Sequence, residues 1–139
     1  MRSALLYRIA SVLIFLFAVG HTVGFRKPAE EGEGRSVGSL MQTVHLKVQG
    51  FDRTFWDFYV GFGLFVTVFL LLAAVLSWQL GGVSAEGLRS IPGAATWGLA
   101  ICFVLVTILS WRYFFAAPGI FSTVIAVCLL AAAALVGRP

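Results

Sequence analysis

Four long apolar segments that are almost free of charge limit how this chain can fold. They span about residues 4–23, 56–80, 94–115 and 118–137. Each is close to the roughly 20 residues that a helix needs to cross the hydrocarbon core of a bilayer. All are too long and too continuous for strands of a buried core. The pattern predicts an all-α protein with four transmembrane helices.

The composition agrees with a membrane protein. Of the 139 residues, 60% are hydrophobic and 12% are charged, whereas a soluble domain is about half apolar and a quarter charged. This balance excludes a disordered chain, a coiled coil, a disulfide scaffold and an ordinary cytosolic enzyme. Cys102 and Cys128 lie inside apolar segments without a metal-binding spacing, so we expect neither a disulfide nor a thiolate metal site.

The formal net charge of +4 does not indicate a nucleic-acid partner. Acidic and basic residues balance within residues 24–57, and the remaining basic residues stand mostly at the ends of apolar segments. Basic residues in such places usually face lipid headgroups or fix the orientation of the helices. The expected partner is therefore the lipid bilayer, and no nucleic acid is expected.

The connections between the segments predict an up-down-up-down bundle that forms a single transmembrane domain over residues 1–139. The third and fourth segments are joined by almost nothing, and Pro118 suits the first turn of the fourth helix, so these two should form a tight antiparallel hairpin. The long first loop, residues 24–55, should cap one end of the bundle. Within it, residues 26–39 read as solvated coil, while residues 40–51 fit either a helical face or an alternating strand.

The first segment and the orientation each allow two interpretations. Arg2 and Arg8 before an apolar run, with Ala18 and Gly20 at plausible cleavage positions, resemble a signal peptide; we expect the segment to be retained as the first span. The same two arginines favour a cytoplasmic N-terminus. The count over the whole chain favours a cytoplasmic loop side instead, with six basic residues (Arg26, Lys27, Arg35, Lys47, Arg53, Arg112) against four (Arg2, Arg8, Arg89, Arg138).

Polar residues at the ends of the segments should meet at one end of such a bundle, under the long loop. His21, Asp57 and Arg112 are the catalytic candidates: His21 or Asp57 could move a proton while Arg112 holds an acid or carbonyl group. Asp57 requires a partner in an apolar environment, and Arg112 or Arg53 could supply it. The expected ligand-binding walls are Thr22, Trp56, Tyr59, Gly61, Trp111 and Tyr113.

Each of these residues also has a structural interpretation. Asp57 and Arg112 would form an ion pair that fixes helix register, and His21 would bond a neighbouring loop. The aromatic residues would form an interfacial belt, matched by Trp78 and Trp97 at the opposite interface. Gly61 would allow close helix packing. His21 and His45 lack a metal-binding spacing, so no metal is expected, and the sequence identifies no cofactor.

Three segments together resemble a known family. The sequences RTFWDFYVGFGL at 53–64, GHT at 20–22 and WRYFF at 111–115 are similar to small bacterial four-helix membrane proteins of unknown function, which carry a WDFYxGFG-like stretch. The resemblance covers nearly the whole chain. It implies the four-helix architecture and a place in the bacterial cytoplasmic membrane, and it implies no activity.

Two functions from different classes fit these observations. The chain could bind a small hydrophobic molecule, such as a lipid, sterol-like or quinone-like compound, at the polar end of the bundle, with or without acid and base chemistry. Alternatively, it could be a non-enzymatic accessory or scaffold subunit whose small-residue faces pack against a second copy or another membrane protein. A channel fits less well, because no line of polar residues runs through the helix centres.

Overall fold

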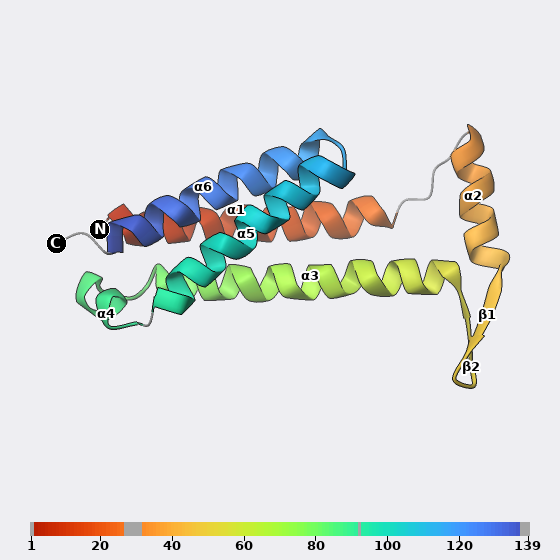
Figure 1. Cartoon of the computed structure of the whole chain (residues 1–139), viewed down its shortest axis with the longest axis horizontal. Coiled ribbons are helices and arrows are strands. Elements are labelled where there is room, and N and C mark those ends of the chain that lie inside the picture. Colours follow the sequence, from red (N-terminus) through yellow and green to blue (C-terminus); the bar gives the residue numbers. More distant parts are fainter. Residues whose placement is uncertain (1, 27–31, 92, 137–139) are drawn as a thin grey trace. The chain divides into compact units, whose positions relative to one another are not determined.

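The computed structural model describes residues 2–26, 32–91 and 93–136. In chain order these residues form α1 (Arg2–Phe25), α2 (Gly32–Thr43), β1 (His45–Val48), β2 (Phe51–Thr54), α3 (Phe55–Leu80), α4 (Ala85–Ser90), α5 (Gly93–Tyr113) and α6 (Ala116–Val136) (Figure 1). The charges expected at Lys27, Glu30, Glu31 and Arg138, the linker residue Pro92 and the end of the fourth segment at 137 lie outside the described residues.

The all-α fold with four long apolar helices is confirmed. Helices α1, α3, α5 and α6 contain 24, 26, 21 and 21 residues. At 1.5 Å per residue they are about 32 to 39 Å long, which is enough for a hydrocarbon core of about 30 Å. Their length and apolar composition mark the chain as an integral membrane protein.

The contacts of the chain divide it into two units. The core unit comprises Met1–Phe17 and Leu70–Pro139, and the loop unit comprises Ala18–Phe69. The up-down-up-down order of all four helices and the capping of the bundle by the long loop therefore stay predictions.

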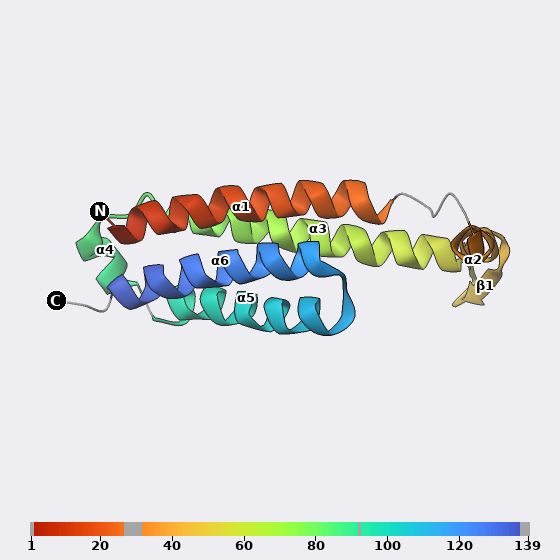
Figure 2. The ribbon, with the colours of Figure 1, turned by 90° about the horizontal axis from the view of Figure 1, so that it is seen from above.

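In the core unit, α5 and α6 lie side by side as an antiparallel hairpin (Figure 2), as the short connection predicts. The connection is tight because Gly119 lets the Trp111 ring approach: a Cβ atom at Gly119 would stand 2.7 Å from that ring. Pro118 is the third residue of α6, where the missing N–H costs no helical hydrogen bond. The interior contains many small residues, among them Ala100, Ser110, Gly119, Ser122, Ala126, Ala132 and Ala133.

Also in the core unit, α1 runs antiparallel to the second half of α3. Ser11 Oγ donates to Ala74 O at 2.7 Å, and Ser77 Oγ donates to Tyr7 O at 2.8 Å. Both serines are buried. Small side chains let the two backbones come close enough for a hydroxyl on one helix to reach a carbonyl on the other, which is a common form of helix association in membranes.

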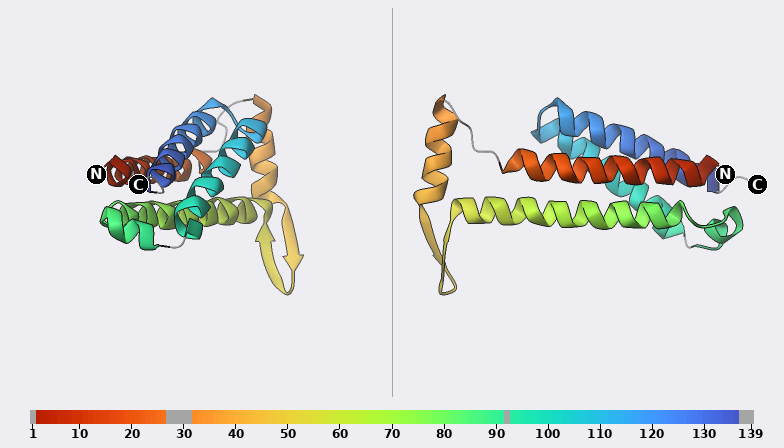
Figure 3. Two further views of the ribbon diagram at one scale, coloured as in Figure 1. Left: turned by 60° about the vertical axis from the view of Figure 1, so that its left-hand side comes forward. Right: turned by 180° about the vertical axis from the view of Figure 1, so that it is seen from behind.

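The coil expected at residues 26–39 is wrong over the described part of that segment in the loop unit. From Gly32 onwards it is helical and belongs to α2. Its charged residues and glycines, the latter of which disfavour a helix, make the segment resemble solvated coil. However, Val37, Leu40, Met41 and Val44 recur at three- and four-residue spacing, and Glu33 in the first turn favours the helix N-terminus. Figure 3 shows α2 and the following hairpin lying crosswise to α3.

Both interpretations of residues 40–51 are realised in successive segments. The helix ends at Thr43, and β1 then pairs antiparallel with β2, with Val48 opposite Phe51. Gln49 and Gly50 connect the strands with φ values of 51° and 85°. Positive φ at both central residues is the mark of a type I′ turn, whose twist suits a two-residue hairpin.

Candidate functional site

The residues that the sequence predicts for a site are distributed over both units. His21, Thr22, Trp56, Asp57, Tyr59 and Gly61 belong to the loop unit, whereas Trp111, Arg112 and Tyr113 belong to the core unit. The meeting of all nine at one end of a bundle therefore stays a prediction. The loop-unit residues are described first.

Asp57 closes the N-terminus of α3 through a reciprocal pair of hydrogen bonds. The Thr54 backbone N–H donates to Asp57 Oδ2 at 2.8 Å, and the Asp57 backbone N–H donates to Thr54 Oγ1 at 3.1 Å. This is a capping box, in which two side chains satisfy N–H groups that have no partner within the helix. This role was not predicted from the sequence, although Thr-x-x-Asp before an apolar run is its signature.

Among the described residues of the loop unit, one basic side chain lies within 4 Å of a carboxylate. It is His45 in the β-hairpin, whose Nδ1 atom lies 2.7 Å from Asp52 Oδ1. Arg53, expected as a possible partner of Asp57, instead donates from Nη1 to Asp52 O at 2.8 Å. Asp57 thus obtains its contacts from the chain that precedes its own helix. Its pairing with Arg112, which lies in the other unit, stays a prediction.

His21 joins α1 to α3 within the loop unit. Its Nε2 atom lies 3.1 Å from Gly63 O, and because a carbonyl oxygen only accepts, Nε2 must carry the hydrogen. One residue further along, Thr22 Oγ1 lies 2.8 Å from Thr67 Oγ1. His21 thus has a structural partner, but that partner lies in helix α3 and not in the neighbouring loop that the structural interpretation expected.

The two threonine hydroxyls have more oxygen neighbours than protons. Thr22 Oγ1 lies 2.7 Å from Ala18 O, and Thr67 Oγ1 lies 3.1 Å from Gly63 O, in addition to their mutual contact. Two protons cannot fill three contacts, so one of the three contacts carries no hydrogen bond at any moment. Since His21 already donates to Gly63 O, Thr67 is able to donate to Thr22 while Thr22 donates to Ala18 O.

A row of aromatic rings links three of the predicted site residues. The His21 and Phe25 ring centroids lie 4.9 Å apart, Phe25 and Tyr59 lie 6.1 Å apart, and Tyr59 and Trp56 lie 5.5 Å apart. Phe25 joins the His21 ring to the Tyr59 ring, and it was not predicted from the sequence. Its signal is the four-residue spacing from His21, which places both on one face of α1.

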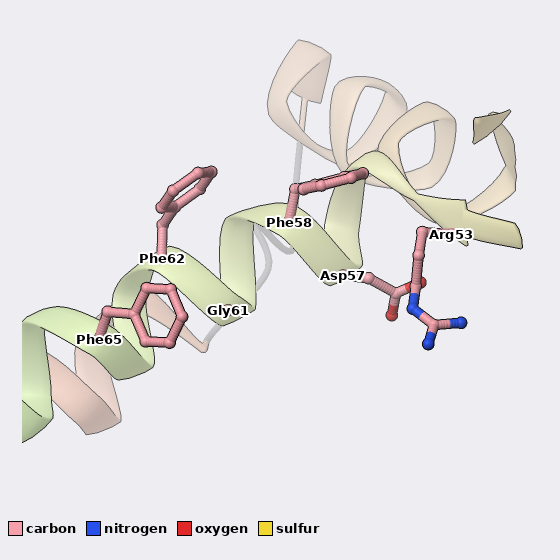
Figure 4. Close-up of a pocket in the computed structure, with 6 residues that line it drawn as sticks. All are labelled: Arg53, Asp57, Phe58, Gly61, Phe62 and Phe65. Carbon is pink, nitrogen blue, oxygen red and sulfur yellow. The ribbon is translucent and has the colours of Figure 1, made fainter. Parts of the chain in front are cut away.

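A shallow groove of about 320 Å³ runs along the first turns of α3 (Figure 4). Asp57, Gly61 and Phe65 follow one another at four-residue spacing, and the Phe58 and Phe62 rings stand beside them. Gly61 opens the groove, since a Cβ atom there would meet nothing within 4 Å. Arg53 lies at the same end as Asp57, so the groove is charged at one end and aromatic along its length.

The core-unit residues serve different contacts. Trp111 Nε1 donates to Thr123 Oγ1 at 3.0 Å, so this indole is held in the α5–α6 hairpin. Arg112 and Tyr113 are exposed at the end of α5, and the Arg112 guanidinium carbon lies 5.5 Å from the Tyr113 ring centroid. Both remain accessible for the anion-holding and wall roles that the sequence predicts.

In the loop unit, both candidates for proton transfer have structural partners. His21 and Asp57, the two candidates for proton transfer, each carry a contact that holds a helix in place. Within residues 2–26, 32–91 and 93–136, no three His, Cys, Asp or Glu side chains are grouped to hold a metal ion.

Comparisons with protein-family models, curated proteins and solved structures gave no match.

Proposed function

We propose that this membrane protein binds an amphipathic small molecule, of lipid-, sterol- or quinone-like chemistry, in the groove beside Gly61. The observation that supports this function is the groove itself, with Arg53 and Asp57 at one end and Phe58, Phe62 and Phe65 along its length. We further propose the bacterial cytoplasmic membrane as its location, on the likeness of residues 53–64 to the bacterial four-helix proteins.

The direction of the groove matches the polarity of a membrane interface. The helix α3 begins at Phe55, so Arg53 and Asp57 lie at the end where the chain enters the apolar layer. From Asp57 to Phe65 the helix rises about 12 Å at 1.5 Å per residue. A bound molecule would place its polar group at the charged end and its apolar body along the aromatic rings.

The chemistry of the two ends defines the class of ligand. Arg53 offers guanidinium N–H donors to a carbonyl, carboxylate or phosphate oxygen. Asp57 uses Oδ2 in the capping box, and its other carboxylate oxygen is able to accept from a hydroxyl or ammonium group. Phe62 and Phe65 are 66% and 63% exposed, so their rings supply apolar contact area that the protein itself leaves open.

A substitution that fills the groove tests the proposal. Gly61→Leu adds a side chain whose Cβ atom meets nothing within 4 Å, so it should fill the groove and block a ligand. Gly20→Leu is the matched control, because Gly20 lies on α1 of the same unit and a Cβ atom there also meets nothing within 4 Å. Native mass spectrometry from mild detergent, with added decylubiquinone or a short-chain phospholipid as the probe, reads the occupancy.

We expect the unmodified protein and Gly20→Leu to retain at least one of these probes, and Gly61→Leu to bind that probe at least tenfold more weakly. A tenfold loss corresponds to about 1.4 kcal/mol. Equal occupancy in Gly61→Leu and the unmodified protein would overturn the proposal. So would retention of neither probe by the unmodified protein.

A second candidate function is that of an accessory or scaffold subunit, and Gly98 favours it. Gly98 lies on α5 of the core unit, is exposed, and has open space around its Cβ position. An exposed glycine on a membrane helix allows a second helix to approach closely. If this face binds another copy, Gly98→Leu should shift the mass in detergent from dimer to monomer, whereas a monomeric unmodified protein would exclude self-association.

A further inference from the structure

A second feature lies in the core unit, where the Arg8 side chain of α1 meets the end of α3. The guanidinium carbon lies 3.7 Å from the centroid of the Trp78 ring. A cation placed over an indole face is held by electrostatic attraction to the ring. Arg8 is half-buried, so this contact fixes the direction in which the guanidinium points.

Two glycines make room for the same side chain. A Cβ atom at Gly81 would lie 2.9 Å from Arg8 Cγ, and one at Gly82 would lie 3.2 Å from Arg8 Nη2. The turn that carries the glycines is itself closed, because the Gly81 N–H donates to Ser77 O and the Gly82 N–H donates to Gln79 O. The backbone N–H groups of this turn are therefore occupied, and the guanidinium is the available donor.

The guanidinium has no anionic partner in the part of the core unit that the structure describes. The one acidic side chain among those described residues is Glu86, and it does not come within 4 Å of Arg8 to form an ion pair. Among the described residues, no atom accepts a hydrogen bond from Arg8. Ser11 and Ser77 beside it each donate to a backbone carbonyl instead. The negative end of the α3 dipole compensates part of the charge, but the N–H donors still require acceptors.

The position along the helix indicates where these acceptors come from. Trp78 lies two residues before the end of α3 at Leu80, which is the level at which tryptophan marks the boundary between hydrocarbon and headgroups. The acceptors present at this depth of a bilayer are the phosphate and ester oxygens of lipids and the water that hydrates them. A guanidinium binds a phosphate through two parallel N–H donors, which an ammonium group cannot reproduce.

We propose that Arg8, held by Trp78 and the Gly81–Gly82 turn, binds the phosphate of a phospholipid headgroup at the membrane face where α3 ends. The site depends on none of the residues that line the groove beside Gly61. The two proposals can therefore fail separately.

The test uses the full chain in mild detergent and native mass spectrometry, with dioleoylphosphatidylglycerol as the probe. Dioleoylglycerol lacks the phosphate, and inorganic phosphate lacks the lipid, so these two distinguish the sources of the chemistry. We expect the phospholipid to be retained, and neither dioleoylglycerol nor inorganic phosphate to bind at the same concentration. Retention of dioleoylglycerol at the same level would overturn the proposal, and equal binding of inorganic phosphate would show a free-anion site instead.

Two variants distinguish the effect of the two parallel guanidinium N–H donors from the effect of the positive charge. Arg8→Lys keeps the charge but loses the two parallel donors, and should bind the phospholipid at least tenfold more weakly. Arg89→Lys is the matched control, because Arg89 is an exposed arginine at the end of α4 in the same unit. Arg89→Lys should bind as the unmodified protein does. Unchanged binding by Arg8→Lys would overturn the proposal.

A measurement on the unmodified protein covers the case in which Arg8→Lys does not fold. The phospholipid should raise the thermal unfolding midpoint, and added sodium chloride should reduce that effect, because the contact is ionic. Dioleoylglycerol should give no such salt-dependent shift. A shift that is equal for both lipids would contradict a phosphate site. The Gly61→Leu variant should retain the salt-dependent shift, which shows that the groove is not its source.

Discussion

The contact between Gly63 and Phe25 gives the most direct test of how α1 and α3 pack in the loop unit. A Cβ atom at Gly63 would lie 2.6 to 2.7 Å from three atoms of the Phe25 ring. Ordinary carbon contacts begin at 3.4 Å, so Gly63→Ala forces the ring to move by about 0.8 Å. That movement disturbs the contacts of Phe25 with His21 and Tyr59, the two rings that it lies between.

We expect Gly63→Ala to lower the free energy of unfolding by about 1 to 3 kcal/mol, the usual cost of overpacking an interior contact. The ring is at the end of a helix and can rotate, which places the value in the lower half of that range. The matched control is Gly20→Ala, where the added methyl meets nothing within 4 Å. Alanine is the better helix former by up to about 1 kcal/mol, so the control should be neutral or stabilising.

Unfolding with increasing sodium dodecyl sulfate, followed by circular dichroism, measures both changes. Phe25→Ala removes the obstacle, and the double variant Phe25→Ala with Gly63→Ala should therefore lose less stability than the two single changes added together. If Gly63→Ala matches Gly20→Ala in stability, the close approach of Phe25 to α3 is wrong. If the double variant is additive, the cost of Gly63→Ala does not come from the Phe25 ring.

Two further changes test the hydrogen bonds described above, in the same unfolding assay. Ser77→Ala removes the bond to Tyr7 O and should cost about 0.6 kcal/mol and at most about 1.7, as interhelical bonds in membranes do; a cost above 3 kcal/mol would show that more than this bond was lost. Thr54→Ala removes the acceptor of the Asp57 N–H and should cost about 1 kcal/mol, whereas Thr54→Ser should restore the stability; a neutral Thr54→Ala would argue against the capping box.

The sequence predicted those parts of the fold that depend on local pattern. Four helices follow from segment length and composition, and the α5–α6 hairpin follows from the short connection and Pro118. The coil expected at 26–39 was wrong over residues 32–39, where charged residues and glycines obscure the helical spacing of the apolar residues in α2. The hairpin turn at Gln49 and Gly50 was not anticipated, because Gln-Gly is a weaker turn signal than Asn-Gly.

The candidate site was less predictable, because it depends on contacts between distant segments. His21, Thr22, Trp56 and Tyr59 were expected in one site, and the structure places all four in the loop unit. Phe25 and Gly63, which lie between them, carry no chemical signal of their own. Asp57 was expected to need an ionic partner. Its carboxylate instead accepts a hydrogen bond from the Thr54 backbone N–H at the N-terminus of its own helix. Likewise, no local pattern brings Arg8 to Trp78, which is 70 residues away.

Polar groups in a membrane protein must satisfy their own donors and acceptors before they are available for chemistry, and this order explains which residues remain as candidates. His21 donates to Gly63 O, Asp57 accepts from Thr54, and Trp111 donates to Thr123. Each such bond reduces the cost of placing the group near hydrocarbon, so each needs no ligand to explain it. A guanidinium differs because it carries five N–H donors in one plane. Ring stacking holds such a group in place without using those donors. A stacked arginine near the headgroups therefore keeps N–H donors that are available to bind a ligand.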